Sequence, residues 1–195
     1  MNIFRYPEGA TPLDPNETRG LRLTHITTRG ELNRWEQENI VEAIAWLERT
    51  QPEDILNESF IKELHKRMFG NVWSWAGKFR ESDKNLGGPW HQVPMALTDF
   101  CNDARLWIEL RKETPDQIAA RFHHRLVSIH PFSNGNGRHS RLMTDVLLEN
   151  VLREPRFSWG GRDLSRSGDQ RKRYIAALRA ADGMNYEPLL AFVRS

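Results

Sequence analysis

Apolar side chains recur every three or four residues over most of the chain after residue 26, and this spacing predicts a series of amphipathic helices. The first helix is expected over residues 27–50, where Leu32, Ile40 and Leu47 fall on one face and Pro52 follows the end. The other helices are expected over residues 57–70, about 96–112, 114–130, 141–154, 168–182 and 186–194.

Two segments lack this helical spacing. Residues 1–26 are rich in proline and glycine, which indicates an irregular N-terminal arm. Residues 71–95 alternate poorly and contain Gly87 and Gly88 directly before Pro89, so we expect a short β-hairpin or extended flap there. The predicted fold class is therefore mainly α, a helical bundle with a short β-hairpin flap.

Length and composition fit a water-soluble protein with one main domain. The chain has 195 residues and a net charge of +2, which is too small to indicate nucleic-acid or membrane binding. Its single cysteine, Cys101, excludes an internal disulfide and suits a reducing compartment. There is no apolar run of about 18 residues and no secretory pattern, so a cytoplasmic location is expected.

The segment "HPFSNGNGRHSR", residues 130–141, lies between two predicted helices and carries most of the candidate chemistry. Gly135 and Gly137 allow backbone N–H groups to approach a ligand closely. The next helix is expected to begin near Arg138, so its positive end faces the same place. Arg138 and Arg141 are three residues apart and share a helix face, which suits adjacent phosphate groups.

The remaining polar residues of this segment complete a site for phosphoryl chemistry. His130 can accept a proton near neutral pH. Asn134 and Asn136 offer amide groups to a metal ion or to a phosphate oxygen. The alternative interpretation is an ordinary interhelical turn with a structural histidine and surface arginines, but the combination in one segment favours a site.

The segment resembles the signature of the Fic (Fic/Doc) family, H-P-F-x-(D/E)-G-N-G-R-x-x-R, at every fixed position except the acidic one. "WSWAGKFR" at 73–80 and "RYIAALRAADGMNYEPLLAF" at 173–192 resemble other parts of the family, so the resemblance covers about residues 30–195. The N-terminal arm is similar to the subgroup labelled mobile mystery protein B. The resemblance implies a Fic-like helical bundle.

The resemblance also implies an activity, the transfer of AMP from ATP to a Ser, Thr or Tyr hydroxyl of a target protein. His130 would be the base. Gly135, Asn136 and Gly137 would form the anion hole, with the Asn136 side chain contributing. The flap near residues 79–93 would hold the target segment as an added strand. Arg138 would hold the β-phosphate, and Arg141 would hold the γ-phosphate.

Asn134 occupies the position where the family places an acidic Mg²⁺ ligand, and an amide oxygen is a weaker ligand than a carboxylate. We therefore expect weaker metal binding and reduced activity. Two alternatives follow from this departure. The enzyme could transfer another group, such as phosphate, UMP or phosphocholine, or the chain could be a nucleotide-binding module that acts by association.

A second resemblance lies at the front of the first helix, where "TTRGELN" at 27–33 is similar to the family's inhibitory pattern (S/T)-x-x-x-E-(G/N). This resemblance implies that Glu31 pairs with Arg141 and blocks productive ATP binding. The alternative is a capping box formed by Thr28 and Glu31. The expected division of the chain is an arm (1–26), an inhibitory helix (27–50) and a core (51–195). The sequence does not decide between a monomer and a homo-oligomer.

Overall fold

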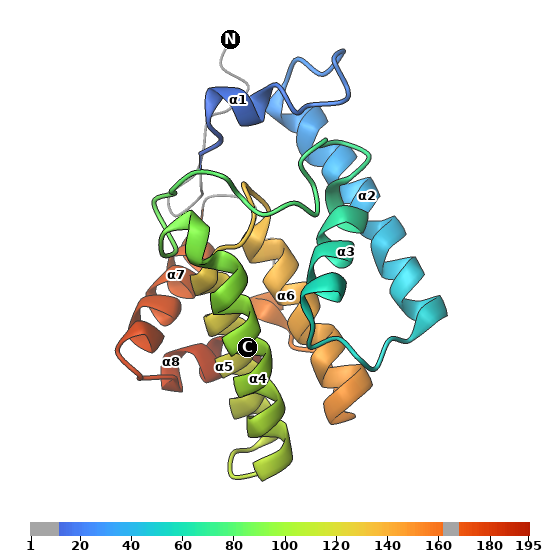
Figure 1. Cartoon of the computed structure of the whole chain (residues 1–195). Helices are drawn as coiled ribbons and strands as arrows, with labels where there is room; N and C mark the ends of the chain where they lie inside the picture. Colours follow the sequence, from blue (N-terminus) through green and yellow to red (C-terminus); the bar gives the residue numbers. More distant parts are fainter. Residues whose placement is uncertain (1–11, 162–167) are drawn as a thin grey trace.

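The computed structural model of the chain describes residues 12–161 and 168–195, and most of these residues are helical (Figure 1). The helices begin and end within a few residues of the expected positions. They are α1 (Pro15–Thr18), α2 (Arg29–Thr50), α3 (Glu58–Phe69), α4 (Val93–Leu110), α5 (Pro115–Ile129), α6 (Asn136–Val146), α7 (Asp169–Asp182) and α8 (Glu187–Val193), with short 3₁₀ turns η1 (Trp90–Gln92) and η3 (Trp159–Gly161) and a π-helical turn η2 (Leu147–Leu152).

The starts of three helices follow from local capping chemistry. Thr28 caps α2 and forms a capping box with Glu31. The side chain of Asn57 accepts a hydrogen bond from the backbone at the start of α3, a position where asparagine is a preferred cap. At α5, Thr114 and Gln117 form a second capping box. These contacts satisfy backbone N–H groups that would otherwise lack a helical partner.

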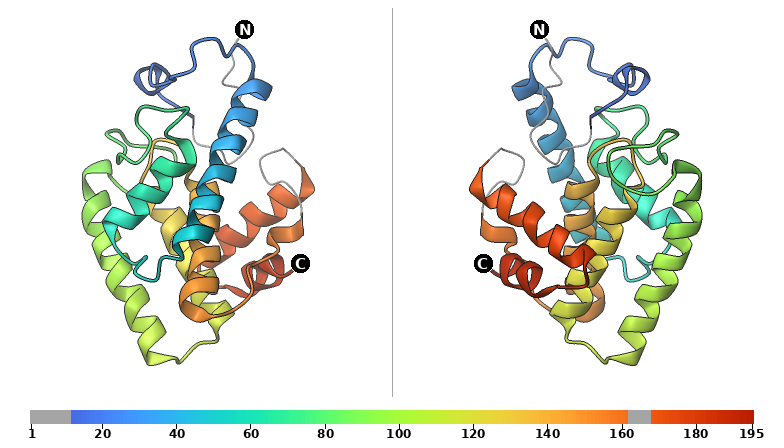
Figure 2. Two further views of the ribbon diagram at one scale, coloured as in Figure 1. Left: turned by 90° about the vertical axis from the view of Figure 1, so that its right-hand side faces the viewer. Right: turned by 90° about the vertical axis from the view of Figure 1, so that its left-hand side faces the viewer.

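The bundle has two hydrophobic clusters that meet along α5 and the end of α6. The larger cluster joins α2, α3, α4, α5 and α6, and includes Phe100 and Phe122, which are fully buried. The smaller cluster packs α7 and α8 against α5 and includes Tyr174 and Phe192. Figures 1 and 2 show α2 and α3 on one side of the bundle and α7 and α8 on the other, with the end of the chain at α8. Cys101 is buried in the larger cluster.

The expected β-hairpin is wrong. Among the described residues the only β-type pairings are two isolated bridges, Leu21 with Trp73 and Phe79 with Phe132. Residues 81–89 form an irregular loop, because the side chain of Arg80 holds the backbone carbonyls of Ser82 and Gly88. One side chain therefore closes the flap where a ladder of backbone hydrogen bonds was expected.

Two further segments differ from the sequence prediction. The arm contains one helical turn, α1, while its first eleven residues lie outside the described part of the chain. The helix that was expected to begin near Arg138 and to continue to residue 154 begins at Asn136, and its last turn is the π-helical segment Leu147–Leu152.

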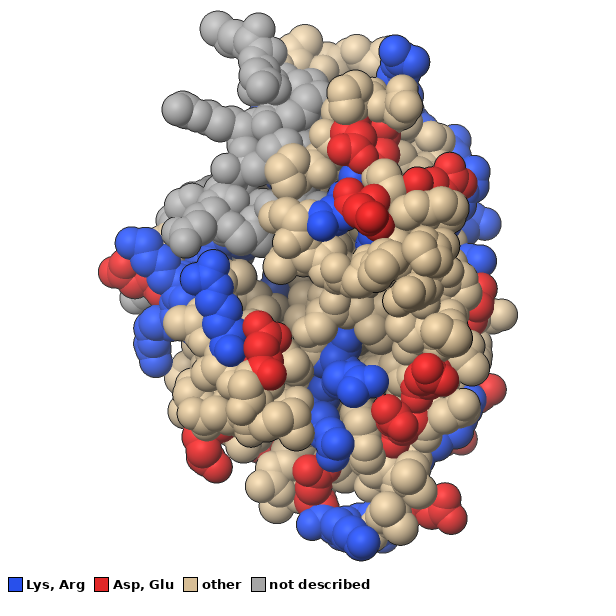
Figure 3. Space-filling view, turned by 60° about the vertical axis from the view of Figure 1, so that its left-hand side comes forward, with Lys and Arg blue, Asp and Glu red and all other residues tan. Residues whose placement is uncertain are grey.

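Charged side chains of both signs are interspersed on the face drawn in Figure 3, in keeping with the small net charge of +2. Across residues 12–161 and 168–195, no helix has the length and apolar character needed to span a membrane.

Candidate functional site

The segment 130–137 makes a sharp turn between two buried helices. The turn begins at His130, which has a φ of 55° at the end of α5, and it ends at Gly135, which has a φ of 79° at the start of α6. A Cβ at Gly135 would lie 2.7 Å from the ring of Phe69, so the turn requires glycine there for two reasons. The backbone of this turn is therefore fixed by the helices on both sides.

Asn136 holds the turn closed from within. Its side-chain oxygen accepts a hydrogen bond from the Phe132 N–H at 2.9 Å, and its side-chain nitrogen donates to the Phe132 carbonyl at 2.7 Å. The residue is 3% exposed. Both polar atoms of the side chain that was expected to contribute to an anion hole therefore bind the loop backbone in this structure.

His65, on α3, packs against the same turn. Its ring stacks on Phe132 with centroids 3.7 Å apart. Its Nδ1 accepts a hydrogen bond from the Gly77 N–H at 3.0 Å, so its Nε2 carries the proton and donates to the Asn134 carbonyl at 3.0 Å. The neutral ring thus joins the base of the flap to the loop that carries His130.

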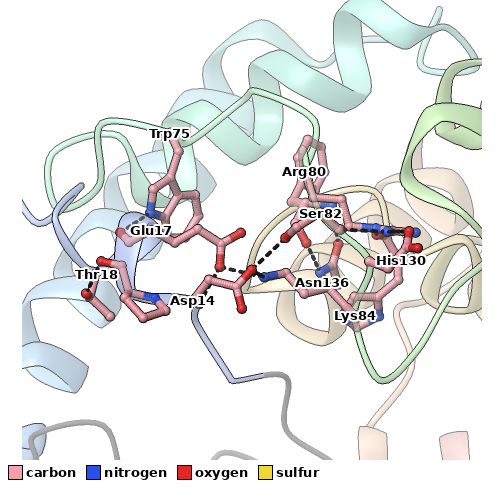
Figure 4. Close-up of polar contacts among 12 residues, drawn as sticks. Asp14, Glu17, Thr18, Trp75, Arg80, Ser82, Lys84, His130 and Asn136 are labelled. Carbon is pink, nitrogen blue, oxygen red and sulfur yellow. Dashed lines mark hydrogen bonds and ion pairs between the residues drawn. The ribbon is translucent and has the colours of Figure 1, made fainter.

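The flap is held against His130 by the guanidinium of Arg80, which is 1% exposed (Figure 4). Arg80 donates from Nε to the His130 carbonyl at 2.7 Å, from Nη1 to the Ser82 carbonyl at 2.9 Å and from Nη2 to the Gly88 carbonyl at 2.5 Å. A Cβ on Gly87 would lie 3.0 Å from the Cβ of His130. The loop from Ser82 to Gly88 therefore lies directly over His130.

The imidazole of His130 is neutral at pH 7. Burial, together with the nearby charges of Arg80 and Lys84, lowers its pKa to about 4, while the hydrogen bond to Val127 acts in the opposite direction. Its Nδ1 lies 3.2 Å from the Val127 carbonyl and donates to it, so the lone pair is on Nε2. This tautomer suits a proton acceptor.

The two arginines of α6 are held by different parts of the molecule. Arg138 lies over the Phe69 ring and donates to the Glu36 carboxylate at 2.6 Å. Arg141 lies over the ring of Tyr174, 5.6 Å from its centroid. A Cβ on Gly137 would lie 3.7 Å from Nη1 of Arg141, so that glycine leaves the first turn of α6 open beside the guanidinium.

Glu36 is a buried carboxylate on α2 with two partners. It is 3% exposed, and its other oxygen accepts a hydrogen bond from the Trp73 indole N–H at 2.7 Å. A buried carboxylate needs partners of this kind, and Arg138 supplies the positive one. Helix α2 therefore contacts the candidate site through Glu36.

The expected pairing of Glu31 with Arg141 is not observed. The Glu31 carboxylate accepts hydrogen bonds from the backbone N–H groups of Thr27 and Thr28, each at 3.0 Å, and these bonds lower its pKa. In the described ranges Glu31 forms no ion pair. The capping-box alternative is correct, because a carboxylate three residues after Thr28 reaches the free N–H groups at the start of its own helix.

The structure brings His130, Asn134, Gly135, Gly137 and Arg138 together in one loop and the first turn of one helix. Asn134 faces its own loop in part, since its side-chain oxygen accepts the Gly135 N–H at 2.7 Å.

The sequence analysis missed three contributors, Arg80, His65 and Glu36. His65 could have been found, because it lies one turn after Ile61 on the apolar face of α3. Glu36 has the same signal, four residues after Leu32 on the buried face of α2. No periodicity marks Arg80, which follows an irregular segment.

Residues 55–148 match the model of the Fic/DOC family. The chain is 37% identical over 99 residues to a protein from Aedes aegypti named protein adenylyltransferase Fic, a match that covers 49% of this chain and 20% of the relative. The chain thus spans about a fifth of the length of that curated relative.

The fold is shared with solved Fic domains. The N-terminal FIC domain of the Bep8 effector from Bartonella sp. 1-1C superposes with a TM-score of 0.66 at 19% identity, covering 97% of this chain and 92% of that one. The N-terminal Fic domain of a Bep effector from Bartonella quintana, solved with bound ADP, superposes with a TM-score of 0.64 at 19% identity, covering 87% and 86%.

We expect Arg80→Lys to lower the free energy of unfolding by about 2–4 kcal/mol, because one ammonium cannot reach three carbonyls and buried carbonyls lose their donors. Urea denaturation would measure the loss. Arg153→Lys is the matched control, since Arg153 has a side chain that is 67% exposed and pairs with Glu53. The control should change stability by less than about 0.5 kcal/mol. Equal effects of the two substitutions would contradict a clamping role for Arg80.

We also expect the protein to lose stability as the pH falls from about 6.5 to 4. Burial lowers the pKa of His65 well below its usual value, that of His130 to about 4 and that of His139 to about 3. Histidines of the unfolded chain take up protons near pH 6.5 while these three remain neutral, so acid favours unfolding. Each contributes a slope of up to about 1.4 kcal/mol per pH unit in this window.

Urea denaturation at pH 7, 5.5 and 4.5 would measure this slope. His139→Gln should reduce it, whereas His91→Gln, which removes an exposed histidine, should leave it unchanged. A free energy of unfolding that stays constant over this range would contradict the role assigned to burial.

Proposed function

The chain belongs to the Fic/DOC family, and on this premise we propose that it is a protein adenylyltransferase that moves AMP from ATP to a Ser, Thr or Tyr hydroxyl of a target protein. The observation that carries the proposal is the position of neutral His130 at one end of a tight loop whose other end is the open start of α6. The name of the Aedes aegypti relative and the ADP bound to the Bartonella quintana domain support it.

In the proposed reaction, Nε2 of His130 accepts the proton of the target hydroxyl. The hydroxyl oxygen forms a bond to the α-phosphorus of ATP, and the bond from that phosphorus to the pyrophosphate oxygen breaks. The low pKa of His130 keeps its acceptor state populated at pH 7. A bound triphosphate would add negative charge beside the ring and raise that pKa toward neutrality, which strengthens the base when the substrate is present.

The phosphates would bind at the start of α6. Gly137 leaves space beside the first turn of this helix, and the positive end of the helix dipole favours an anion there. Arg138 and Arg141, one turn apart, would neutralise the β- and γ-phosphates. In this proposal Asn136 contributes its backbone N–H, while its side chain keeps the loop closed.

The family implies Mg²⁺, and the residues present fit it only with the help of the nucleotide. No cluster of three metal-binding side chains occurs within residues 12–161 and 168–195, so the triphosphate would supply most of the ligands. We propose Asn134 as the protein ligand, through its amide oxygen, which would also reduce activity relative to an acidic residue. The ion would neutralise phosphate charge.

We further propose that α2 restrains the enzyme through Glu36. The Glu36 carboxylate binds Arg138 at 2.6 Å, and a guanidinium engaged in that pair is less available to a phosphate. In this proposal α2 is the inhibitory helix. Glu36, and not Glu31, supplies the carboxylate that competes with a phosphate for an arginine of α6.

We expect His130→Ala to lower transfer by about 10²–10⁴-fold while ATP binding is kept, since the substitution removes the base and leaves the anion site. Labelling of a cell extract with α-³²P-ATP and γ-³²P-ATP measures the transfer, and ATP binding by calorimetry is the control. Transfer of α-label alone supports adenylylation. Transfer of γ-label would indicate a kinase, and ATP binding without transfer in the wild type would indicate a binding module.

We expect Glu36→Gln to raise labelling about tenfold, which corresponds to about 1.4 kcal/mol of relieved competition for Arg138. Glutamine keeps an oxygen for the Trp73 N–H and removes the charge that holds the arginine. Glu31→Gln is the matched control on the same helix and should leave labelling unchanged. If both variants label alike, α2 does not restrain the site through Glu36.

A further inference from the structure

Residues 13–22 lie along the base of the flap and are attached to it by backbone contacts. The Ser74 N–H donates to the Gly20 carbonyl at 2.8 Å, and the Arg22 N–H donates to the Val72 carbonyl at 2.8 Å. Leu21 and Trp73 form an isolated antiparallel bridge between these two bonds. The indole N–H of Trp75 also donates to a carbonyl of this segment, that of Glu17. We call residues 13–22 the strap.

The strap carries two carboxylates that meet a buried lysine of the flap (Figure 4). Nζ of Lys84 lies 2.7 Å from the Asp14 carboxylate and 2.6 Å from the Glu17 carboxylate, and the Lys84 side chain is 2% exposed. The hydroxyl of Ser82 donates to the same Asp14 oxygen at 2.6 Å. The Lys84 ammonium and the Ser82 hydroxyl lower the pKa of Asp14, so the carboxylate is charged at neutral pH.

The carboxylates are presented as a unit by one helical turn. Asp14 caps α1, and Glu17 accepts the Asp14 N–H at 2.7 Å, which fixes the two side chains three residues apart on one face. The Asp14 side chain is 48% exposed, so solvent reaches this ion pair. A salt-sensitive contact of this kind can open without unfolding the core.

The position of Lys84 links this contact to the proposed reaction. Lys84 and Ser82 lie in the loop that Arg80 fixes over His130. A cavity of about 470 Å³ lies beside this contact, and its lining includes Asp14 of the strap, Ser82 of the flap and Ser133 of the loop that follows His130. A segment that replaced the strap at Lys84 would therefore lie next to the site of transfer.

We propose that Lys84 and Ser82 form the recognition site for an acidic segment of the target protein, and that the strap occupies this site as an intramolecular substitute. The inference rests on the proposed function for the identity of the partner. A buried ammonium without a counter-charge is costly, so the occupant that displaces the strap must bring carboxylates of its own. Two acidic residues three positions apart on a helical turn match the geometry of Asp14 and Glu17.

The test uses a fluorescent peptide with the sequence of residues 12–22, PLDPNETRGLR, and the full chain carrying Asp14→Lys and Glu17→Lys. Charge reversal repels the strap from Lys84 and exposes the site. The wild type should bind the peptide at least about tenfold more weakly, because its own strap competes at high effective concentration. Glu38→Lys with Glu109→Lys, two exposed residues, gives the same change in net charge and should behave as the wild type.

Fluorescence anisotropy would measure binding. A peptide with Asn and Gln in place of the two acidic residues should bind at least about tenfold more weakly, and added salt should weaken only the acidic peptide. Adding Lys84→Gln to the charge-reversed protein should abolish the difference between the peptides, and Lys84→Arg should restore it. Equal binding of the acidic and neutral peptides, or an acidic preference that survives Lys84→Gln, would overturn the proposal.

A second measurement separates this inference from the proposed function. The acidic peptide should inhibit α-³²P labelling of extract proteins by the charge-reversed variant, and the neutral peptide should not. If labelling is absent in every variant, the adenylyltransferase proposal fails while the anisotropy result still decides the recognition site. If labelling occurs and saturating acidic peptide does not inhibit it, targets do not use Lys84.

Discussion

The candidate site depends on one buried cation, the guanidinium of Arg80. Its three hydrogen bonds to the protein go to backbone carbonyls, one of His130 and two in the flap. A planar group with donors on three nitrogens can reach three carbonyls that are spread apart, whereas the donors of a lysine all lie on one nitrogen. The distance between the flap and His130 is therefore set by the length of one side chain.

The hydrogen bonds of Arg80 also explain why the flap is not a hairpin. Backbone pairing across the flap would have used the carbonyls of Ser82 and Gly88 in a ladder, but Arg80 binds both. His65 acts in the same way on the other side of the loop, with one ring nitrogen on Gly77 and the other on Asn134. Side chains that bind backbone groups, rather than strands, thus hold the irregular part of the molecule to the helical part.

The helices could be predicted from the sequence because each depends on local spacing and capping, as Asn57 and Thr114 illustrate. That His130, the loop glycines and Arg138 lie close together could also be predicted, because they are near neighbours in one segment. The partners that cross the fold could not. Glu36 and Arg138 are far apart in sequence, and Glu31 fits a familiar pattern although it only caps its own helix. A pattern can place a carboxylate on a helix, but tertiary packing decides which arginine it meets.

The left-handed backbone conformation of His130 limits which residues can replace it without disturbing the turn. A φ of 55° is strained for most residues and is tolerated best by glycine, asparagine and aspartate. A change of this histidine to asparagine would remove the imidazole and preserve the turn and its closure by Asn136. Under the proposed function, transfer would be lost and the anion site kept, so one substitution that the backbone tolerates would separate chemistry from nucleotide binding.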